Sequence, residues 1–154
     1  MLVTQSEILK IVRDGQAKGN TFVVTNGCFD ILHVGHVRYL KKTKEYADYS
    51  IVMLNSDISV KSIKGDSRPI NNEQDRAEIL SSLSCVDYVV LFDEKSPAKL
   101  LEEIKPNIYT KGADYTLETL PERDVVIKNN IKVEFIEFVE GKSTTNTIKK
   151  INEK

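Results

Sequence analysis

Residues 21–36 read TFVVTNGCFDILHVGH, and this stretch decides how the rest of the chain is interpreted. Its first part, 21–26, is a short β-branched run typical of a buried strand. His33 and His36 follow three residues apart, which places both imidazoles on one side of a helical turn. A helix that begins there would direct its free N–H groups and its positive end to the same point, and Gly35 would let a ligand approach closely. The stretch therefore predicts a site for an anionic phosphate.

The histidine pair has two other interpretations, a structural pair or half of a metal site. HxxH is an allowed zinc spacing, but no third ligand cluster accompanies it, so we expect no protein-bound metal. The two cysteines, Cys28 and Cys85, form no CxxC motif and indicate reduced thiols in a reducing compartment. We interpret Cys28 as a small apolar filler of the loop, because no further histidine is available to activate it as a nucleophile.

Strands and helices alternate on both sides of this stretch. Five apolar runs predict strands at 21–26, 50–56, 86–92, 107–111 and 132–138. Helices are predicted after Thr4, at 37–47, after Asn71 or Asn72, at 98–104 with Ser96 as N-cap and Pro97 as the first helical residue, after Pro121, and after Ser143. Residues 57–70 are polar and predict a loop.

Continuous apolar strands alternating with helices predict an α/β, Rossmann-like, doubly wound parallel five-stranded sheet with helices on both faces. Ligands of such folds bind at the carboxyl ends of the strands, near the switch in strand order. We expect one domain, 1–154, with an N-terminal helix in 1–19 and the catalytic core in 20–152.

Composition excludes several classes of function. Of the 154 residues 40% are hydrophobic and 29% charged, as in a globular domain, and the formal net charge of −1 makes nucleic acid an unexpected partner. The first 15 residues carry acidic side chains among the apolar ones, and no run approaches the roughly 20 apolar residues needed to cross a bilayer. We therefore expect no signal peptide, no membrane association and a cytoplasmic location.

The motifs resemble those of the cytidylyltransferase-like nucleotidyltransferases. The similarity begins with TNGCFDILHVGHVRYL and continues through NSDISVKSIKGDSRPI, DRAEIL, VDYVVLFDEKSPAKLLEEIKPNIYTKGADY and FVEGKSTTNTIKKI, covering about 20–152. Within that family the chain is similar to heptose adenylyltransferases, which otherwise form one domain of a bifunctional enzyme of lipopolysaccharide synthesis. No sugar-kinase domain accompanies it, so the expectation is the stand-alone form.

The resemblance implies roles for matching residues. His33, His36 and Lys64 would stabilise charge on phosphate oxygens during catalysis, which fits a reaction governed by positioning and electrostatics. The nucleotide would be bound by Asn26, Gly27, Cys28, Phe29, Asp30, His33, Gly35, His36, Lys111, Gly112, Ala113, Asp114, Gly141, Ser143, Thr144 and Thr145. The acceptor would be bound by Asp30, Lys61, Lys64, Arg68 and Arg76, with a solvated loop position as the alternative for Lys61, a structural salt bridge as the alternative for Arg76, and an ordinary N-cap as the alternative for Ser143. Mg²⁺ is expected to bind through the nucleotide phosphates.

The resemblance implies transfer of AMP from ATP to D-glycero-D-manno-heptose 1-phosphate, giving ADP-heptose and pyrophosphate for lipopolysaccharide or another heptose-containing surface glycan. Ala113 leaves room for a purine where glycerol-phosphate cytidylyltransferases have aspartate, and Phe138 stands where they have arginine. Two alternatives remain, a cytidylyltransferase acting on glycerol 3-phosphate or a related alcohol phosphate, and a nucleotide-binding module without catalysis. A homodimer or larger homo-oligomer is compatible with the sequence, which does not fix the oligomeric state.

Overall fold

The computed structural model of the chain describes residues 1–137 and 143–153, and its strands form a parallel sheet. The strands are β1 (Leu2–Val3), β2 (Phe22–Gly27), β3 (Tyr49–Asn55), β4 (Tyr88–Phe92), β5 (Ile108–Gly112) and β6 (Lys132–Ile136). Every strand pair is parallel, and the order across the sheet is β1-β4-β3-β2-β5-β6. The chain builds outward from β2 to β3 and β4, then returns to place β5 on the other side of β2. The switch point therefore lies between the carboxyl ends of β2 and β5.

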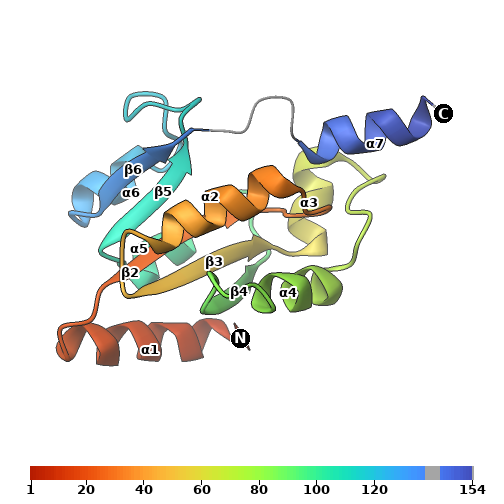
Figure 1. Ribbon diagram of the computed structural model, residues 1–154. Coiled ribbons are helices and arrows are strands. Elements are labelled where there is room, and N and C mark those ends of the chain that lie inside the picture. The colour runs from red at the N-terminus through yellow and green to blue at the C-terminus, as the bar shows by residue number, and fades with distance from the viewer. Residues whose placement is uncertain (138–142, 154) are drawn as a thin grey trace.

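Helices cover both faces of this sheet (Figure 1). They are α1 (Gln5–Ala17), α2 (Val34–Lys44), α3 (Asp57–Lys64), α4 (Glu73–Ser81), α5 (Ala98–Ile104), α6 (Arg123–Lys128) and α7 (Thr144–Asn152). The apolar sides of α1, α5 and α6 pack on one face of the sheet and form a single core cluster with it. Helices α2 and α4 pack on the opposite face in a second cluster. Alternation along β3 explains the division, because Ile51 and Met53 join the first cluster and Val52 and Leu54 the second.

The predicted fold class is confirmed, with one correction to the number of strands. The sheet has six strands instead of five, because Leu2–Val3 pairs with Val89–Val90 of β4 at the edge of the sheet. A strand of two residues carries no periodicity, so the sequence pattern could not reveal it. Thr4 then caps α1 with a full capping box in which the Glu7 side chain accepts from the Thr4 amide, as a helix start there requires.

The expected loop at 57–70 is wrong in its first half, where the chain forms α3. Ser56 caps this helix by accepting from Ser59 N, and Gly65 ends it with a φ of 92°. The helix has a weak sequence signal, since Val60 is buried while Ile58 is exposed. As a consequence of α3, Lys64, the predicted catalytic lysine of this segment, is the last residue of a helix and not part of a loop. The predicted start of α5 is wrong by one residue, because the helix begins at Ala98 and Pro97, not Ser96, is its N-cap.

Candidate active site

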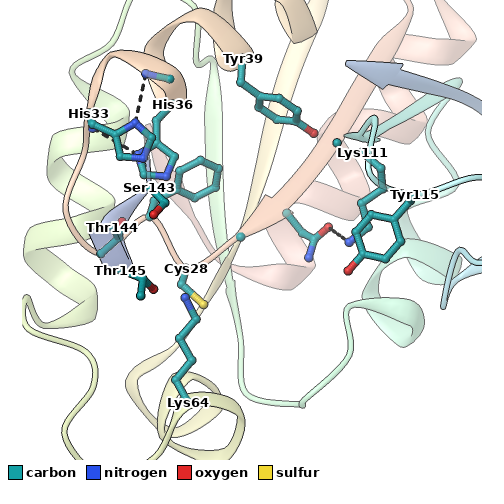
Figure 2. Close-up of a pocket in the computed structure, with 15 residues that line it drawn as sticks. Cys28, His33, His36, Tyr39, Lys64, Lys111, Tyr115, Ser143, Thr144 and Thr145 are labelled. Carbon is teal, nitrogen blue, oxygen red and sulfur yellow. Dashed lines mark hydrogen bonds between the residues drawn. The ribbon is translucent and has the colours of Figure 1, made fainter. Parts of the chain in front are cut away.

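A cavity of about 320 Å³ opens at the switch point between β2 and β5. It is lined by Asn26, Gly27, Cys28, Phe29, His33, Gly35, His36, Tyr39, Lys64, Lys111, Gly112, Tyr115, Ser143, Thr144 and Thr145. Figure 2 shows the two histidines and the α7 hydroxyls at one side of the cavity and Lys111 with Tyr115 at the other, with Lys64 extending toward Cys28. Thirteen of these fifteen residues were predicted as site residues from the sequence, and the other two, Tyr39 and Tyr115, were not.

The HxGH turn fixes the orientation of both imidazoles. His33 is the N-cap of α2, and its Nδ1 accepts a hydrogen bond from the Gly35 amide at 3.1 Å. The Nδ1 of His36 accepts from the His33 amide at 3.2 Å, and the two rings stack with centroids 3.8 Å apart. A backbone N–H can only donate, so each Nδ1 is unprotonated and the proton of each neutral ring is on Nε2. The helix amides expected to face a phosphate are thus partly used to orient the histidines.

The His36 side chain is a neutral hydrogen-bond donor at physiological pH. Burial, the adjacent His33 and the ammonium of Lys64 together lower the pKa of His36 from 6.5 to about 4. Burial is the largest of these causes, because it removes the water that would solvate an imidazolium. A neutral ring in this tautomer presents one Nε2–H group, which suits an oxyanion that it need not neutralise.

The loop that follows β2 requires a glycine at its start. A Cβ at Gly27 would lie 2.7 Å from Cε2 of Phe29, whose own φ is 45°. The Phe29 ring in turn packs against His36 with centroids 5.3 Å apart. Burial raises the pKa of the Cys28 thiol, which is therefore protonated and a weak nucleophile. The loop positions groups around the cavity and supplies no covalent nucleophile.

Lys64 is the acceptor-site candidate of α3 that the structure brings to the cavity. It is the last residue of the helix, it is exposed, and it lines the cavity wall beside Cys28 (Figure 2). Lys61 lies one turn earlier and does not line the cavity, and Arg68 follows in the connecting loop, also outside the lining. The predicted roles of Lys61 and Arg68 stay predictions.

Asp30 and Arg76 lie behind the cavity and hold its loops together. The Asp30 carboxylate accepts from the amides of Ile70 and Asn71 at 2.8–3.0 Å, which ties the loop after α3 to the HxGH loop. Arg76 is completely buried and donates to the carbonyl oxygens of Cys28 and of two other residues. Its guanidinium also pairs with the Asp57 carboxylate at 2.8 Å, the structural salt bridge that the sequence left open. Neither side chain lines the cavity, so their contacts are with the protein's own loops.

The other end of the cavity contains a partly buried lysine. The Lys111 ammonium donates to Asn26 Oδ1 at 3.3 Å and lies 5.1 Å from the ring centroid of Tyr115. Burial lowers the pKa of Lys111, and the Glu122 and Asp114 carboxylates raise it. Asp114 and the preceding Ala113 do not line the cavity, although Gly112 does.

The start of α7 contributes three hydroxyls to the cavity rim, those of its N-cap Ser143 and of Thr144 and Thr145. Ser143 caps the helix by accepting from the Asn146 amide at 3.0 Å, so its predicted N-cap role is confirmed. Thr144 donates to the Ile31 carbonyl at 3.0 Å, which fixes the helix start against the HxGH loop. Gly141 and Phe138 lie outside the described residues.

Tyr39 of α2 was missed because an aromatic residue on a helix usually indicates core packing. Its hydroxyl joins a network under the cavity with Thr25 at 2.9 Å and Thr110 at 3.3 Å, and Thr43 continues the network at 3.1 Å. This network connects α2 to β2 and β5, the two strands that flank the switch point. Tyr115 of the segment after β5 was missed because its contact with Lys111 is not encoded by any local spacing.

Two negative findings apply to residues 1–137 and 143–153. None of their His, Cys, Asp and Glu side chains gather in a group of three or more that could hold a metal ion. None of their helices has the length and apolar character needed to cross a membrane.

Comparisons with known proteins place the chain in a family. The Cytidylyltransferase-like family matches residues 24–150. The bifunctional protein HldE of Geobacter metallireducens is 51% identical over 92% of this chain, and that of Aliarcobacter butzleri is 50% identical over 97%. The chain spans only 29% and 31% of the length of these two relatives. The crystal structure of the lipopolysaccharide core biosynthesis protein from Thermoplasma volcanium covers 80% of this chain, with a TM-score of 0.63 and 33% identity. The chain belongs to the Cytidylyltransferase-like family and is a nucleotidyltransferase.

Proposed function

We propose that this member of the Cytidylyltransferase-like family transfers AMP from ATP to D-glycero-D-manno-heptose 1-phosphate, giving ADP-heptose and pyrophosphate. The product would serve synthesis of lipopolysaccharide or another heptose-containing surface glycan. The proposal rests on the hydrogen-bond donors at one end of the cavity, which suit an anionic phosphate. There His33 and His36 lie together on the HxGH turn, and Lys64 approaches from α3. Similarity to the HldE proteins and to a lipopolysaccharide core biosynthesis protein supports the heptose branch of the family.

The reaction needs no covalent intermediate on the protein. A phosphate oxygen of the sugar phosphate attacks the α-phosphorus of ATP, a new P–O bond forms, and the bond to the β,γ-diphosphate breaks on the opposite side. The Nε2–H group of His36 would donate to an oxygen whose negative charge grows in the transition state. Lys64 would supply the positive charge that this neutral donor lacks, and the protonated Cys28 thiol would take no part.

The donors of the cavity also indicate how Mg²⁺ would bind. Its wall presents imidazole, ammonium and hydroxyl groups, which suit an anion, whereas Mg²⁺ prefers carboxylate, carbonyl and water oxygens. The residues therefore fit a cation that arrives with the triphosphate and is held by phosphate oxygens. Bound there, Mg²⁺ would neutralise charge on the phosphates, while this chain's residues orient the nucleotide.

The test is a pyrophosphate-release screen. ATP, CTP, GTP and UTP are each combined with both anomers of the heptose 1-phosphate, glycerol 3-phosphate and glucose 1-phosphate. We expect release with ATP and one heptose 1-phosphate anomer, and much less with CTP, as the resemblance to the heptose adenylyltransferases implies. Equal or better turnover of CTP with glycerol 3-phosphate would replace the proposal by a cytidylyltransferase. Nucleotide binding without turnover on any acceptor would point to a binding module instead.

A further inference from the structure

A buried carboxylate outside the cavity has no evident structural role. Glu122 stands directly before α6, is 3% exposed, and does not line the cavity. Its Oε1 lies 3.8 Å from the Lys111 ammonium, and its Oε2 has no hydrogen-bond partner among residues 1–137 and 143–153. It is the N-cap residue of α6, but its side chain makes no capping hydrogen bond. Burying a carboxylate with so few partners costs stability. The contact with Lys111 is therefore the place to look for the role of Glu122.

Lys111 connects this carboxylate to the cavity. Its side chain is 14% exposed, lines the cavity, and donates to Asn26 Oδ1. The Tyr109 hydroxyl donates to the same oxygen at 2.6 Å. Two donors on Oδ1 fix the Asn26 carboxamide, so its NH₂ group points away from them. Because Asn26 also lines the cavity, Lys111 and Tyr109 together set the orientation that its carboxamide presents there.

We propose that Glu122 is a positioning residue for nucleotide binding, which holds the Lys111 ammonium at the cavity wall and, through it, the orientation of the Asn26 carboxamide. The proposal rests on the proposed function only in taking a nucleoside triphosphate as the ligand. It assigns a binding role to a residue that never touches that ligand, and no local motif of the sequence singles out this residue.

The pair also determines the pH range in which Lys111 is charged. The ionisable groups around Lys111 are Glu122, Asp114 of the segment after β5, and the phenols of Tyr109 and Tyr115. Burial raises the pKa of Tyr109 well above 10, so this phenol stays neutral. Without the Glu122 charge, burial acts on Lys111 against Asp114 alone, and the ammonium loses its proton at a lower pH than in the wild type. Affinity that depends on the ammonium is present below that pKa and is lost as pH rises through it.

The first experiment measures binding of ATP with Mg²⁺ by calorimetry, without acceptor and without turnover. Glu122→Gln is compared with Asp124→Asn, which removes an exposed carboxylate two residues further along at the same helix end. We expect Glu122→Gln to weaken binding about tenfold, the size of one hydrogen bond to a charged group, and Asp124→Asn to change it less than about twofold. Equal affinities of the two variants would overturn the proposal.

A pH series separates positioning from a general structural effect. As pH rises toward 10.5, the ordinary pKa of a lysine, the affinity of Glu122→Gln should fall at a lower pH than that of the wild type. Arginine stays charged throughout this range, so the variant Lys111→Arg/Glu122→Gln should lose the extra pH dependence. An equal loss of affinity at every pH, unaffected by the arginine, would show that Glu122 acts only on packing.

A charge-balanced pair keeps the test valid if Glu122→Gln unfolds. In a Lys111→Met background, Glu122→Gln should have no further effect on ATP affinity, and an additional loss there would refute the proposal. The outcome is distinct from that of the proposed function. Wild-type protein that binds ATP but never releases pyrophosphate would defeat the adenylyltransferase proposal while leaving this comparison intact. Normal turnover with unchanged Glu122→Gln binding would defeat only the inference about Glu122.

Discussion

Arg76→Met removes a guanidinium that joins four segments around the cavity. Its Nη1 donates to the carbonyl oxygens of Cys28 and Asn55, each at 2.7 Å, and its Nε to the Asn71 carbonyl at 3.0 Å. Its Nη2 pairs with Asp57 at 2.8 Å, and the Arg76 side chain has no exposed surface. Methionine would fill much of the same volume but could donate to none of these oxygens.

The structure determines the size of the expected effect. Removing one partner of a buried ion pair costs about 3–5 kcal/mol, because the remaining groups stay buried without a partner. The Asp57 side chain is 33% exposed and water can solvate it, which favours the lower end, about 3 kcal/mol. At about 2–4 °C per kcal/mol for a domain of this size, the melting temperature should fall by roughly 6–12 °C. ATP affinity should also fall at temperatures where the variant is folded, since the Cys28 carbonyl loses its anchor.

The assay is urea and thermal unfolding of the variant together with ATP binding. Arg38→Met, on the exposed side of α2, is the matched control and should stay within about 0.5 kcal/mol of the wild type. Asp57→Asn should lie between the two variants. A melting temperature of Arg76→Met within about 2 °C of the wild type, combined with a raised KM for the sugar phosphate, would refute this reasoning and assign Arg76 to the acceptor.

Three further predictions concern the donors of the cavity. Lys64→Ala should lower kcat/KM for both substrates while the free energy of unfolding changes by less than about 0.5 kcal/mol, because Lys64 is exposed; unchanged kinetics would move the missing cation to Lys61 or Arg68. His33→Ala and His36→Ala should each lower kcat about 10²–10³-fold with smaller effects on ATP binding, and near-normal kcat in either variant would make that histidine structural. Nuclear magnetic resonance should find the His36 pKa near 4, with the proton of the neutral ring on Nε2. The free energy of unfolding should fall as pH drops from 6.5 toward 4, because in this range the unfolded histidine binds a proton and the folded one does not. A His36 titration near pH 6.5 would contradict that assignment.

Local spacing predicted the parts of the site that are built locally. The HxGH turn, the Thr4 cap and the Asn72 cap each depend on contacts within three residues, and the structure confirms all three. The position of the cavity followed from parallel strands and a switch in their order, which needs only the alternation of elements. These features are determined before any tertiary contact is known, so periodicity and capping rules are sufficient for them.

The features that the sequence did not predict depend on tertiary contacts or on very short elements. Leu2–Val3 becomes a strand only because β4 offers a free edge, and α3 forms from a polar segment through its Ser56 cap. The contact of Glu122 with Lys111 spans eleven residues and requires α6 to begin against the end of β5. The role of Arg76 could not be predicted either. An arginine that binds the acceptor and one that forms a buried structural salt bridge have the same sequence pattern, and only the burial seen in the structure distinguishes the two roles.

Charge is distributed unevenly along the cavity, and this distribution bears on catalysis. Ammonium groups stand apart at two positions, Lys64 beside the HxGH loop and Lys111 at the opposite end, while His36, at the same end as Lys64, is a neutral donor. Two imidazolium rings stacked at 3.8 Å would repel each other, so the HxGH geometry itself opposes a second positive charge there. A neutral donor binds a ground-state phosphate only weakly and gains most where an oxygen acquires charge. If the cavity binds a nucleoside triphosphate as proposed, the lysines would set its affinity from the two ends of the cavity, and the histidine pair would lower the barrier to transfer.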